Sequence, residues 1–244
     1  ETLRYFRVAL ADAEVDVQLN RRVTAVDLVG FDDVVLATGV TPRIPDVKGI
    51  DHPKVVTYLD VLRDHVSVGS TVAVMGAGGI GFDVAEYLTQ SGPSATVTPD
   101  RFYAEWGIDT SYSNRGGLTQ VHLERPPRKI TLLQRKHSKV GGGLGKTTGW
   151  IHRTELKKRG VDMVPGVTYE SIDDAGLHMT IDDQPVVLDV ETIVVCTGQE
   201  PQRELLADLE AAPATVHVIG GADVAAELDA KRAIKQGTEV AAAL

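Results

Sequence analysis

One short stretch constrains the fold of this chain more than any other. The apolar, β-branched run Thr71 to Met75 leads directly into the residues GAGGIG, and Ile80, Val84 and Leu88 then recur at four-residue spacing. This order predicts a strand, a glycine turn and an amphipathic helix that ends before Gly92. In such a turn the glycines permit a tight bend, close approach of a pyrophosphate and close packing of helix on strand. The stretch therefore predicts a dinucleotide-binding α/β unit.

The first candidate site residues come from this turn. The amides at the start of the helix have no partner within the helix, and the helix dipole places partial positive charge there. A pyrophosphate would be held by these backbone groups rather than by side chains. The predicted cofactor-binding residues of the turn are Gly76, Ala77, Gly78, Gly79, Ile80 and Gly81.

The end of the next predicted strand indicates which dinucleotide is bound. The strand Lys129 to Gln134 is followed by Arg135 and Lys136, where a domain that binds NAD usually carries Asp or Glu for the ribose 2′-hydroxyl. A guanidinium instead suits a 2′-phosphate, which it can bind through paired, charge-assisted hydrogen bonds. Gly81 and Arg135 are 54 residues apart, against the usual ~20, so this reading requires an insertion, predicted as irregular structure over about residues 91–128. The pattern favours NADP(H).

The loop VGGGLGKTTGW, Val140 to Trp150, contains a GKT triplet like that of ATP-binding loops. Such loops need a further glycine five residues before Gly145, and that position holds Val140, so the ATP interpretation is disfavoured. Because the loop follows Arg135, its flanking and internal lysines, Lys139 and Lys146, are candidates to neutralise the 2′-phosphate. Trp150 is a candidate wall for a flavin or nicotinamide ring, with packing in the core as the alternative.

Composition excludes several classes of protein. The net charge of −9 argues against nucleic-acid or anionic-membrane partners, although residues 121–160 carry eleven Lys or Arg against two acids.

No apolar run approaches the ~20 residues of a membrane span and no signal pattern is present, so a soluble, cytoplasmic location is expected. The single cysteine, Cys196, excludes a disulfide framework, a cysteine-ligated cluster and a C-x-x-C pair within this chain. We predict neither a metal site nor a catalytic acid–base residue.

The remaining pattern predicts a Rossmann-like, three-layer α/β domain. A helix at 148–159 and a strand at 161–164 precede three short alternating strands at 167–172, 176–181 and 185–189, which predict an antiparallel meander. The continuous apolar run 192–196 is typical of a strand buried in a parallel sheet. The chain ends with a strand at 216–219, a glycine pair and a helix at 224–244.

A repeat divides the chain. The segments DVVLATGVTP (33–42) and TIVVCTGQEP (192–201) match as a strand, a small residue, a Thr-Gly turn and a proline, and they place Gly39 and Gly198 in equivalent positions. The second copy follows the glycine fingerprint of its own domain, whereas no such fingerprint precedes the first copy. The sequence also starts without Met. We therefore expect a piece of a longer polypeptide.

Six segments in order carry a family resemblance: GAGGIGFD, EWGIDTS, LLQRKHSK, GLGKTTGWIHR, CTGQEP and IGGADVAAELDAKRAIKQG. They resemble the C-terminal portion of the bacterial NADPH-dependent 2,4-dienoyl-CoA reductases, flavin and iron–sulfur enzymes related to trimethylamine dehydrogenase. The resemblance implies an oxidoreductase of fatty acid β-oxidation in which NADPH reduces FAD, and electrons reach the dienoyl thioester through a 4Fe–4S cluster and FMN. FMN, the cluster and the acyl-CoA pocket would belong to an N-terminal barrel of the same polypeptide, outside this chain.

The resemblance also implies a division into domains. Residues 68–198 would form the NADP-binding domain, and residues 1–50 and 199–244 would form two parts of a split FAD-binding domain. Gly39 and the run Gly220, Gly221, Ala222 and Asp223 fall where such enzymes hold FAD. Asp223 could accept a hydrogen bond from a ribitol hydroxyl, and capping of the following helix is its other reading. Without the upstream fingerprint, FAD binding in this chain is expected to be weak or absent.

Three other interpretations compete with this one. A nucleotide-binding module without catalysis of its own and another NADPH-dependent flavin reductase both remain open. A flavin-dependent disulfide reductase would need a second cysteine, which the chain lacks.

Overall fold

The computed structural model describes residues 1–209, 212–226 and 230–244. The chain divides into two compact units: unit 1 comprises Glu1–Val40 and Pro201–Leu244, and unit 2 comprises Thr41–Glu200. The boundaries differ from the predicted limits at 50, 68 and 198, because strand β3 (Val55–Thr57) joins the sheet of unit 2 beside β10 (Thr192–Val195). The segment 41–67 is thus part of unit 2, including residues 41–50, which were predicted to belong to the FAD-binding domain.

The centre of unit 2 is a five-stranded parallel sheet in the order β3-β10-β4-β5-β6. Its other strands are β4 (Thr71–Met75), β5 (Lys129–Leu133) and β6 (Asp162–Val164). Every residue of β10 is buried, as expected for a strand with neighbours on both sides and a layer on each face. The strand order reverses at β4, with β10 on one side and β5 on the other.

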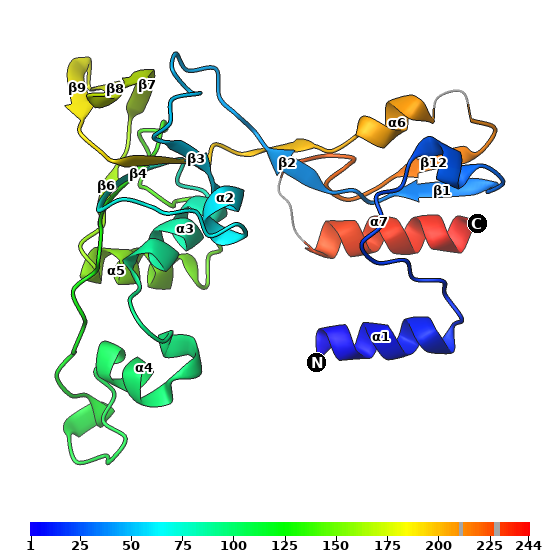
Figure 1. Cartoon of the computed structure of the whole chain (residues 1–244). Coiled ribbons are helices and arrows are strands. Elements are labelled where there is room, and N and C mark those ends of the chain that lie inside the picture. The colour runs from blue at the N-terminus through cyan, green and yellow to red at the C-terminus, as the bar shows by residue number, and fades with distance from the viewer. Residues whose placement is uncertain (210–211, 227–229) are drawn as a thin grey trace. The chain divides into compact units, whose positions relative to one another are not determined.

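Two different layers cover the faces of this sheet (Figure 1). Helices α2 (Tyr58–Leu62), α3 (Gly79–Thr89) and α5 (Gly149–Lys158) lie on one face, and the antiparallel meander β7 (Val167–Asp173), β8 (Gly176–Ile181) and β9 (Gln184–Leu188) lies on the other. Alternate residues of β4 serve the two layers: Val72 and Val74 pack with the helices, while Ala73 and Met75 pack with the meander. The predicted three-layer architecture is confirmed.

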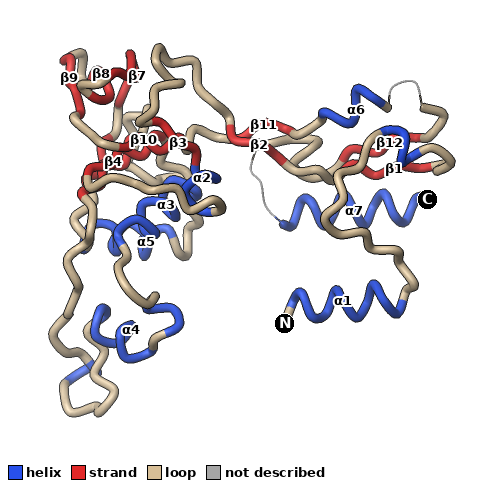
Figure 2. The backbone as a smooth tube through the Cα atoms, in the orientation of Figure 1, coloured by secondary structure: helices blue, strands red, loops and turns tan. Residues whose placement is uncertain are grey.

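The insertion between α3 and β5 is mostly loop (Figure 2). It also contains the helix α4 (Pro99–Trp106) and the short 3₁₀ turns η2 (Ala95–Val97) and η3 (Arg115–Gly117), so the expectation of wholly irregular structure was wrong. Local signals define this helix: Pro99 occupies its first turn and Gly107 ends it in the left-handed conformation, at φ 64°.

Unit 1 is built around a single parallel strand pair. Strand β1 (Asp33–Leu36) pairs with β12 (Thr215–Val218), and Val34, Leu36 and Leu209 are the buried residues of a small apolar cluster. Its helical elements are α1 (Thr2–Asp12), η1 (Ala25–Leu28), α6 (Glu204–Asp208) and α7 (Ala230–Ala243).

The chain crosses between the units within β2 (Val40–Pro42) and β11 (Gln199–Pro201), which pair with each other. The predicted C-terminal helix starts later than expected, because residues 224–226 are not helical; residues 227–229 of that prediction lie outside the described residues. No helix in the described ranges has the length and apolar character needed to cross a membrane.

Candidate dinucleotide-binding site

The glycine turn after β4 is shaped by close backbone contacts. Gly76 has φ 110°, and a Cβ atom there would strike the carbonyl oxygen of Cys196; a Cβ on Gly81 would strike the carbonyl oxygen of Gly76. Only glycine is compatible with both positions. Gly78, which precedes the first turn of α3, has no atom within 4 Å of its would-be Cβ. The turn therefore packs tightly against the sheet while its outer side stays open to a ligand.

A cavity of about 410 Å³ opens at the carboxyl ends of β4, β5 and β10, where the strand order reverses. Ligands of open α/β sheets bind at this place. The cavity is lined by Gly76, Ala77, Gly78, Gln134, Arg135, Lys136, Ser138, Gly142, Gly143, Tyr169, Cys196, Thr197 and Gly198. The fold thus brings together six of the predicted site residues: Gly76, Ala77, Gly78, Arg135, Lys136 and Gly198.

The other three residues predicted from the glycine turn lie within α3. Gly79 is exposed, Ile80 packs against the apolar core and Gly81 is buried. They shape and support the turn without lining the cavity.

Arg135 and Lys136 supply positive charge to the rim. Both are exposed, and neither forms an ion pair with a carboxylate of the described residues. Gln134 shapes the loop that carries them: its amide nitrogen donates to the carbonyl oxygens of Lys136 (2.9 Å) and Ser138 (2.7 Å). Its amide oxygen accepts from the backbone N–H of Gly141 at 3.2 Å. These bonds hold the two cations at the mouth of the cavity.

The Thr-Gly turn after β10 forms the opposite wall. Gly198 has φ 112°, and Thr197 donates through Oγ1 to the carbonyl oxygen of Arg43 at 3.0 Å. In return the Arg43 guanidinium donates to the Thr197 carbonyl oxygen, and the Arg43 backbone N–H donates to that of Gly198 at 3.0 Å. Arg43 was missed from the sequence, because no local signal links it to a turn 154 residues away.

Tyr169, on β7, also lines the cavity and was not predicted. Its hydroxyl is buried and has no hydrogen-bond partner among the described residues. Burial holds the pKa of this phenol well above its ordinary value, although the nearby charge of Arg135 acts in the opposite direction. The hydroxyl therefore stays protonated, as a neutral donor.

The structure separates three further predicted residues from this cavity. Lys139 and Trp150 line a different groove, and Lys146 is exposed outside both. Trp150 is 56% exposed, so its alternative role in core packing is wrong. The loop folds this way because Gly141, at φ 68°, packs against the ring of Phe82, and Arg153 donates to the Gly141 carbonyl oxygen at 2.9 Å.

The predicted flavin positions lie together in unit 1. A Cβ on Gly221 would approach the backbone of Gly39 at 3.2 Å. Arg203 donates to the Ala222 carbonyl oxygen at 2.5 Å and also to that of Asp223. Gln236, on α7, donates to the Asp223 carboxylate at 2.7 Å and accepts from the Gly220 N–H at 2.8 Å. Helix capping by Asp223 is wrong, because the residues directly after it are not helical.

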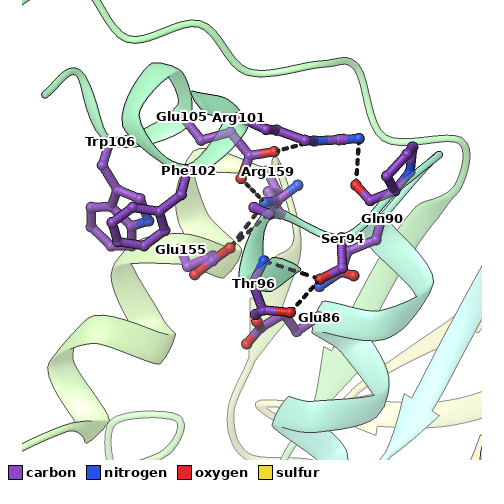
Figure 3. A pocket seen from close by; sticks show the side chains of 12 residues that line it. Glu86, Gln90, Ser94, Thr96, Arg101, Phe102, Glu105, Trp106, Glu155 and Arg159 are labelled. Carbon is purple, nitrogen blue, oxygen red and sulfur yellow. Dashed lines mark hydrogen bonds and ion pairs between the residues drawn. The ribbon is translucent and has the colours of Figure 1, made fainter. Parts of the chain in front are cut away.

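The EWGIDTS segment, Glu105 to Ser111, stabilises the insertion through hydrogen bonds. Glu105 is buried and accepts from Arg159 at 2.7 Å, and it also accepts from Arg101 at 2.9 Å (Figure 3). Asp109 accepts from the amides of Ser111 and Asn114 at 2.9 Å and 2.8 Å. The hydrogen bonds of Glu105 connect the insertion to Arg159, at the end of α5. Those of Asp109 close the loop that follows α4.

Cys196 does not provide thiol chemistry. It is buried at the end of β10, and burial raises the pKa of its thiol to about 12. The reactive form of a cysteine is the thiolate, so this residue is a packing residue whose carbonyl oxygen faces Gly76.

The parallel sheet, the glycine turn and the cavity at the strand-order reversal define an FAD/NAD(P)-binding type of α/β domain. Residues 4–231 match the family model for pyridine nucleotide-disulphide oxidoreductases. The chain belongs to this family, whose members are oxidoreductases that bind FAD and NAD(P)H.

Several known proteins are similar to parts of this chain. A metal reductase of Desulforamulus reducens is 26% identical over 227 residues, which are 89% of this chain and 32% of that protein. A cinnamate reductase of Clostridium sporogenes is 33% identical over 97 residues, which are 39% of this chain and 14% of that protein. The solved structure of a 2-naphthoyl-CoA reductase complex superposes with a TM-score of 0.74 at 21% identity, over 97% of this chain and 31% of that one. The chain thus spans about a third or less of these proteins.

Proposed function

We propose that this chain is the NADPH-binding and FAD-reducing portion of a flavoenzyme similar to 2,4-dienoyl-CoA reductase. The observation that carries the proposal is the cavity at the ends of β4, β5 and β10, with an open glycine turn on one side and two unpaired cations on the other. A backbone-lined cradle beside fixed positive charge suits a dinucleotide that carries an additional phosphate.

Different residues of the cavity would bind different parts of NADP(H). The turn Gly76–Gly78 and the start of α3 would present backbone N–H groups to the pyrophosphate. Arg135 and Lys136 would face the 2′-phosphate, and Gln134 fixes the loop that holds them. Thr197 and Gly198 would limit the cavity on the side of β10. Bound NADPH would supply a hydride and bound FAD would accept it, so the protein orients cofactors rather than acting as an acid or base.

Unit 1 would contribute only part of a flavin site. Gly39 and Gly221 approach each other closely, and Asp223 already accepts a hydrogen bond from Gln236. A flavin hydroxyl would therefore compete with that amide for the same carboxylate. We propose that FAD binds this chain weakly, and that FMN, a 4Fe–4S cluster and the acyl-CoA substrate belong to an N-terminal barrel of the same polypeptide.

The dienoyl-CoA assignment rests on the motif resemblance, and above all on the EWGIDTS and GLGKTTGWIHR segments. A second candidate is another NADPH-dependent flavin reductase with a different electron acceptor. The metal reductase of Desulforamulus reducens favours it, since its similarity extends over 89% of this chain. The first step, reduction of a flavin by NADPH, is common to both candidates.

The test is steady-state oxidation of NADPH by the protein with added FAD and an artificial electron acceptor. Turnover that depends on protein and FAD together, and that falls in Arg135→Ala, would support flavin reduction. Saturable NADPH binding without turnover would instead indicate a nucleotide-binding module with no catalysis of its own. Absence of NADPH binding would refute the proposal as a whole.

A further inference from the structure

A second groove, of about 470 Å³, is lined in part by Lys139 and Val140 of the loop that carries Arg135 and Lys136. Its walls come from that loop, from α5 and from the end of β6, and it shares no lining residue with the dinucleotide cavity. We call it the Trp150 groove. Its volume is within the range of small-molecule sites, so a ligand of mononucleotide size would fit.

The floor and one wall of the Trp150 groove are apolar. Val140 is 6% exposed, Met163 packs partly against the core, and Pro165 completes the floor. Above them stands Trp150, more than half exposed. The indole ring is therefore accessible to a ligand in the groove that it lines. An indole beside an apolar floor is a surface on which a flat ring can stack.

Three cations surround this apolar surface: Lys139 from the loop, and Arg153 and Lys157 from α5. Within the described ranges, no carboxylate forms an ion pair with any of them. The acid of the same helix, Glu155, is bound by Arg159 at 2.9 Å (Figure 3). In a chain with net charge −9, such a local excess of free positive charge attracts anions.

We propose that the Trp150 groove binds a nucleoside phosphate, with the base stacked on Trp150 and the phosphates held by Lys139, Arg153 and Lys157. The combination requires a ligand that is flat and apolar at one end and strongly anionic at the other. This site is separate from the proposed NADP(H) cavity, and it gives a ligand to Lys139, which flanks the glycine-rich loop, and to Trp150, which ends it.

The test uses ADP as the probe and tryptophan fluorescence as the signal. The chain has two tryptophans, and Trp106→Phe leaves Trp150 as the sole reporter. We expect saturable quenching by ADP, and a dissociation constant about tenfold higher in the double variant Lys139→Ala/Lys157→Ala, because two charge-assisted contacts are lost. Lys146→Ala/Lys158→Ala is the matched control: it also removes one positive charge from the loop and one from α5, both outside the groove.

Calorimetry on the wild-type protein repeats the measurement without any tryptophan substitution. ADP should bind with an affinity that Gly78→Ala leaves unchanged, because that methyl group meets no protein atom and lies only in the dinucleotide cavity, where the pyrophosphate would approach. Adenosine and inorganic pyrophosphate should each bind more weakly than ADP. The proposal is overturned if ADP does not bind, if Lys146→Ala/Lys158→Ala weakens binding as much as Lys139→Ala/Lys157→Ala, or if Gly78→Ala abolishes it. Because Gly78→Ala changes the dinucleotide cavity and not the Trp150 groove, binding of ADP in the former is distinguished from binding in the latter.

Discussion

The two units of this chain contain the same kind of strand and Thr-Gly turn in very different surroundings. In unit 2 the turn Thr197–Gly198 follows a strand with neighbours on both sides, and Arg43 binds its backbone. In unit 1 the turn Thr38–Gly39 follows one of two paired strands. Gln202 also binds this turn, since Thr38 Oγ1 donates to its carbonyl oxygen at 2.6 Å and its N–H donates to the Gly39 carbonyl oxygen at 3.0 Å, but no atom lies within 4 Å of a would-be Cβ on Gly39. Helices α1 and α7 bury none of their residues. The same local motif thus produces a finished binding wall only where a complete sheet supports it.

The largest expected effect contrasts a buried ion pair of unit 2 with an exposed one of unit 1. Glu105→Ala leaves the buried Arg159 guanidinium with one carboxylate fewer, so the free energy of unfolding should fall by about 3 kcal/mol. Glu204→Ala breaks the pair with Arg22, whose side chains are 70% and 84% exposed, and should cause no measurable change. Urea unfolding of both variants checks this. Equal losses would contradict the contrast.

A second contrast concerns glycines of one turn. Gly81→Ala places a methyl group against the Gly76 carbonyl oxygen, and should lower the free energy of unfolding by about 2 kcal/mol through overpacking. NADPH binding should weaken as α3 shifts away from β4. Gly79→Ala, in the same helix with open space around it, should be neutral or slightly stabilising. Thermal unfolding with and without NADPH measures both, and a stable, tightly binding Gly81→Ala would refute the packing argument.

A third substitution tests selectivity. Arg135→Ala should raise the dissociation constant of NADPH about tenfold and leave that of NADH nearly unchanged, because only NADPH carries the 2′-phosphate. Arg22→Ala, which removes an exposed arginine of unit 1, should affect neither cofactor. The measurement is fluorescence titration with both nucleotides. An unchanged NADPH preference in Arg135→Ala would remove this residue from the site.

The smallest expected effect is a pH dependence of the free energy of unfolding that comes from Glu86 in α3. Burial raises the pKa of Glu86, and the charge of Glu155 raises it further. The folded state therefore binds this proton more tightly than the unfolded state does, and stability is lost as pH rises from the unfolded pKa through the folded one. Glu86→Gln should match the wild type near pH 4 and be slightly more stable at pH 7. Since the side chain is partly exposed, the gain should stay below about 0.5 kcal/mol. Thermal unfolding at both pH values measures it, and a difference independent of pH would contradict the assignment.

The parts of the fold that were predictable from the sequence rest on local patterns. The run Thr71–Met75 with its glycine turn, the meander and the buried strand 192–195 each carry their own periodicity. Arg135 was predicted from the general rule that the residue after the second strand faces the ribose. Helix α4 had clear end signals in Pro99 and Gly107, which the polar composition around them obscured.

The rest depends on contacts between distant residues. Arg159 and Glu105 are 54 residues apart, and Arg43 and Thr197 are 154 apart. Tyr169 reaches the cavity from the meander, a layer that the glycine-turn rule does not include. The loop after β5 was predicted to bind an anion because of its position near Arg135, but only the three-dimensional path of the backbone separates Lys136 from Lys139 and Trp150. No sequence pattern specifies that path.

The most direct test of this account is one calorimetric experiment, in which the purified protein is titrated with NADPH and then with FAD. If unit 2 holds a complete NADP(H) site and unit 1 only part of a flavin site, NADPH should bind with one-to-one stoichiometry at the dinucleotide cavity, and FAD should bind weakly or not at all. Stoichiometric, tight FAD binding together with no measurable NADPH binding would contradict the account.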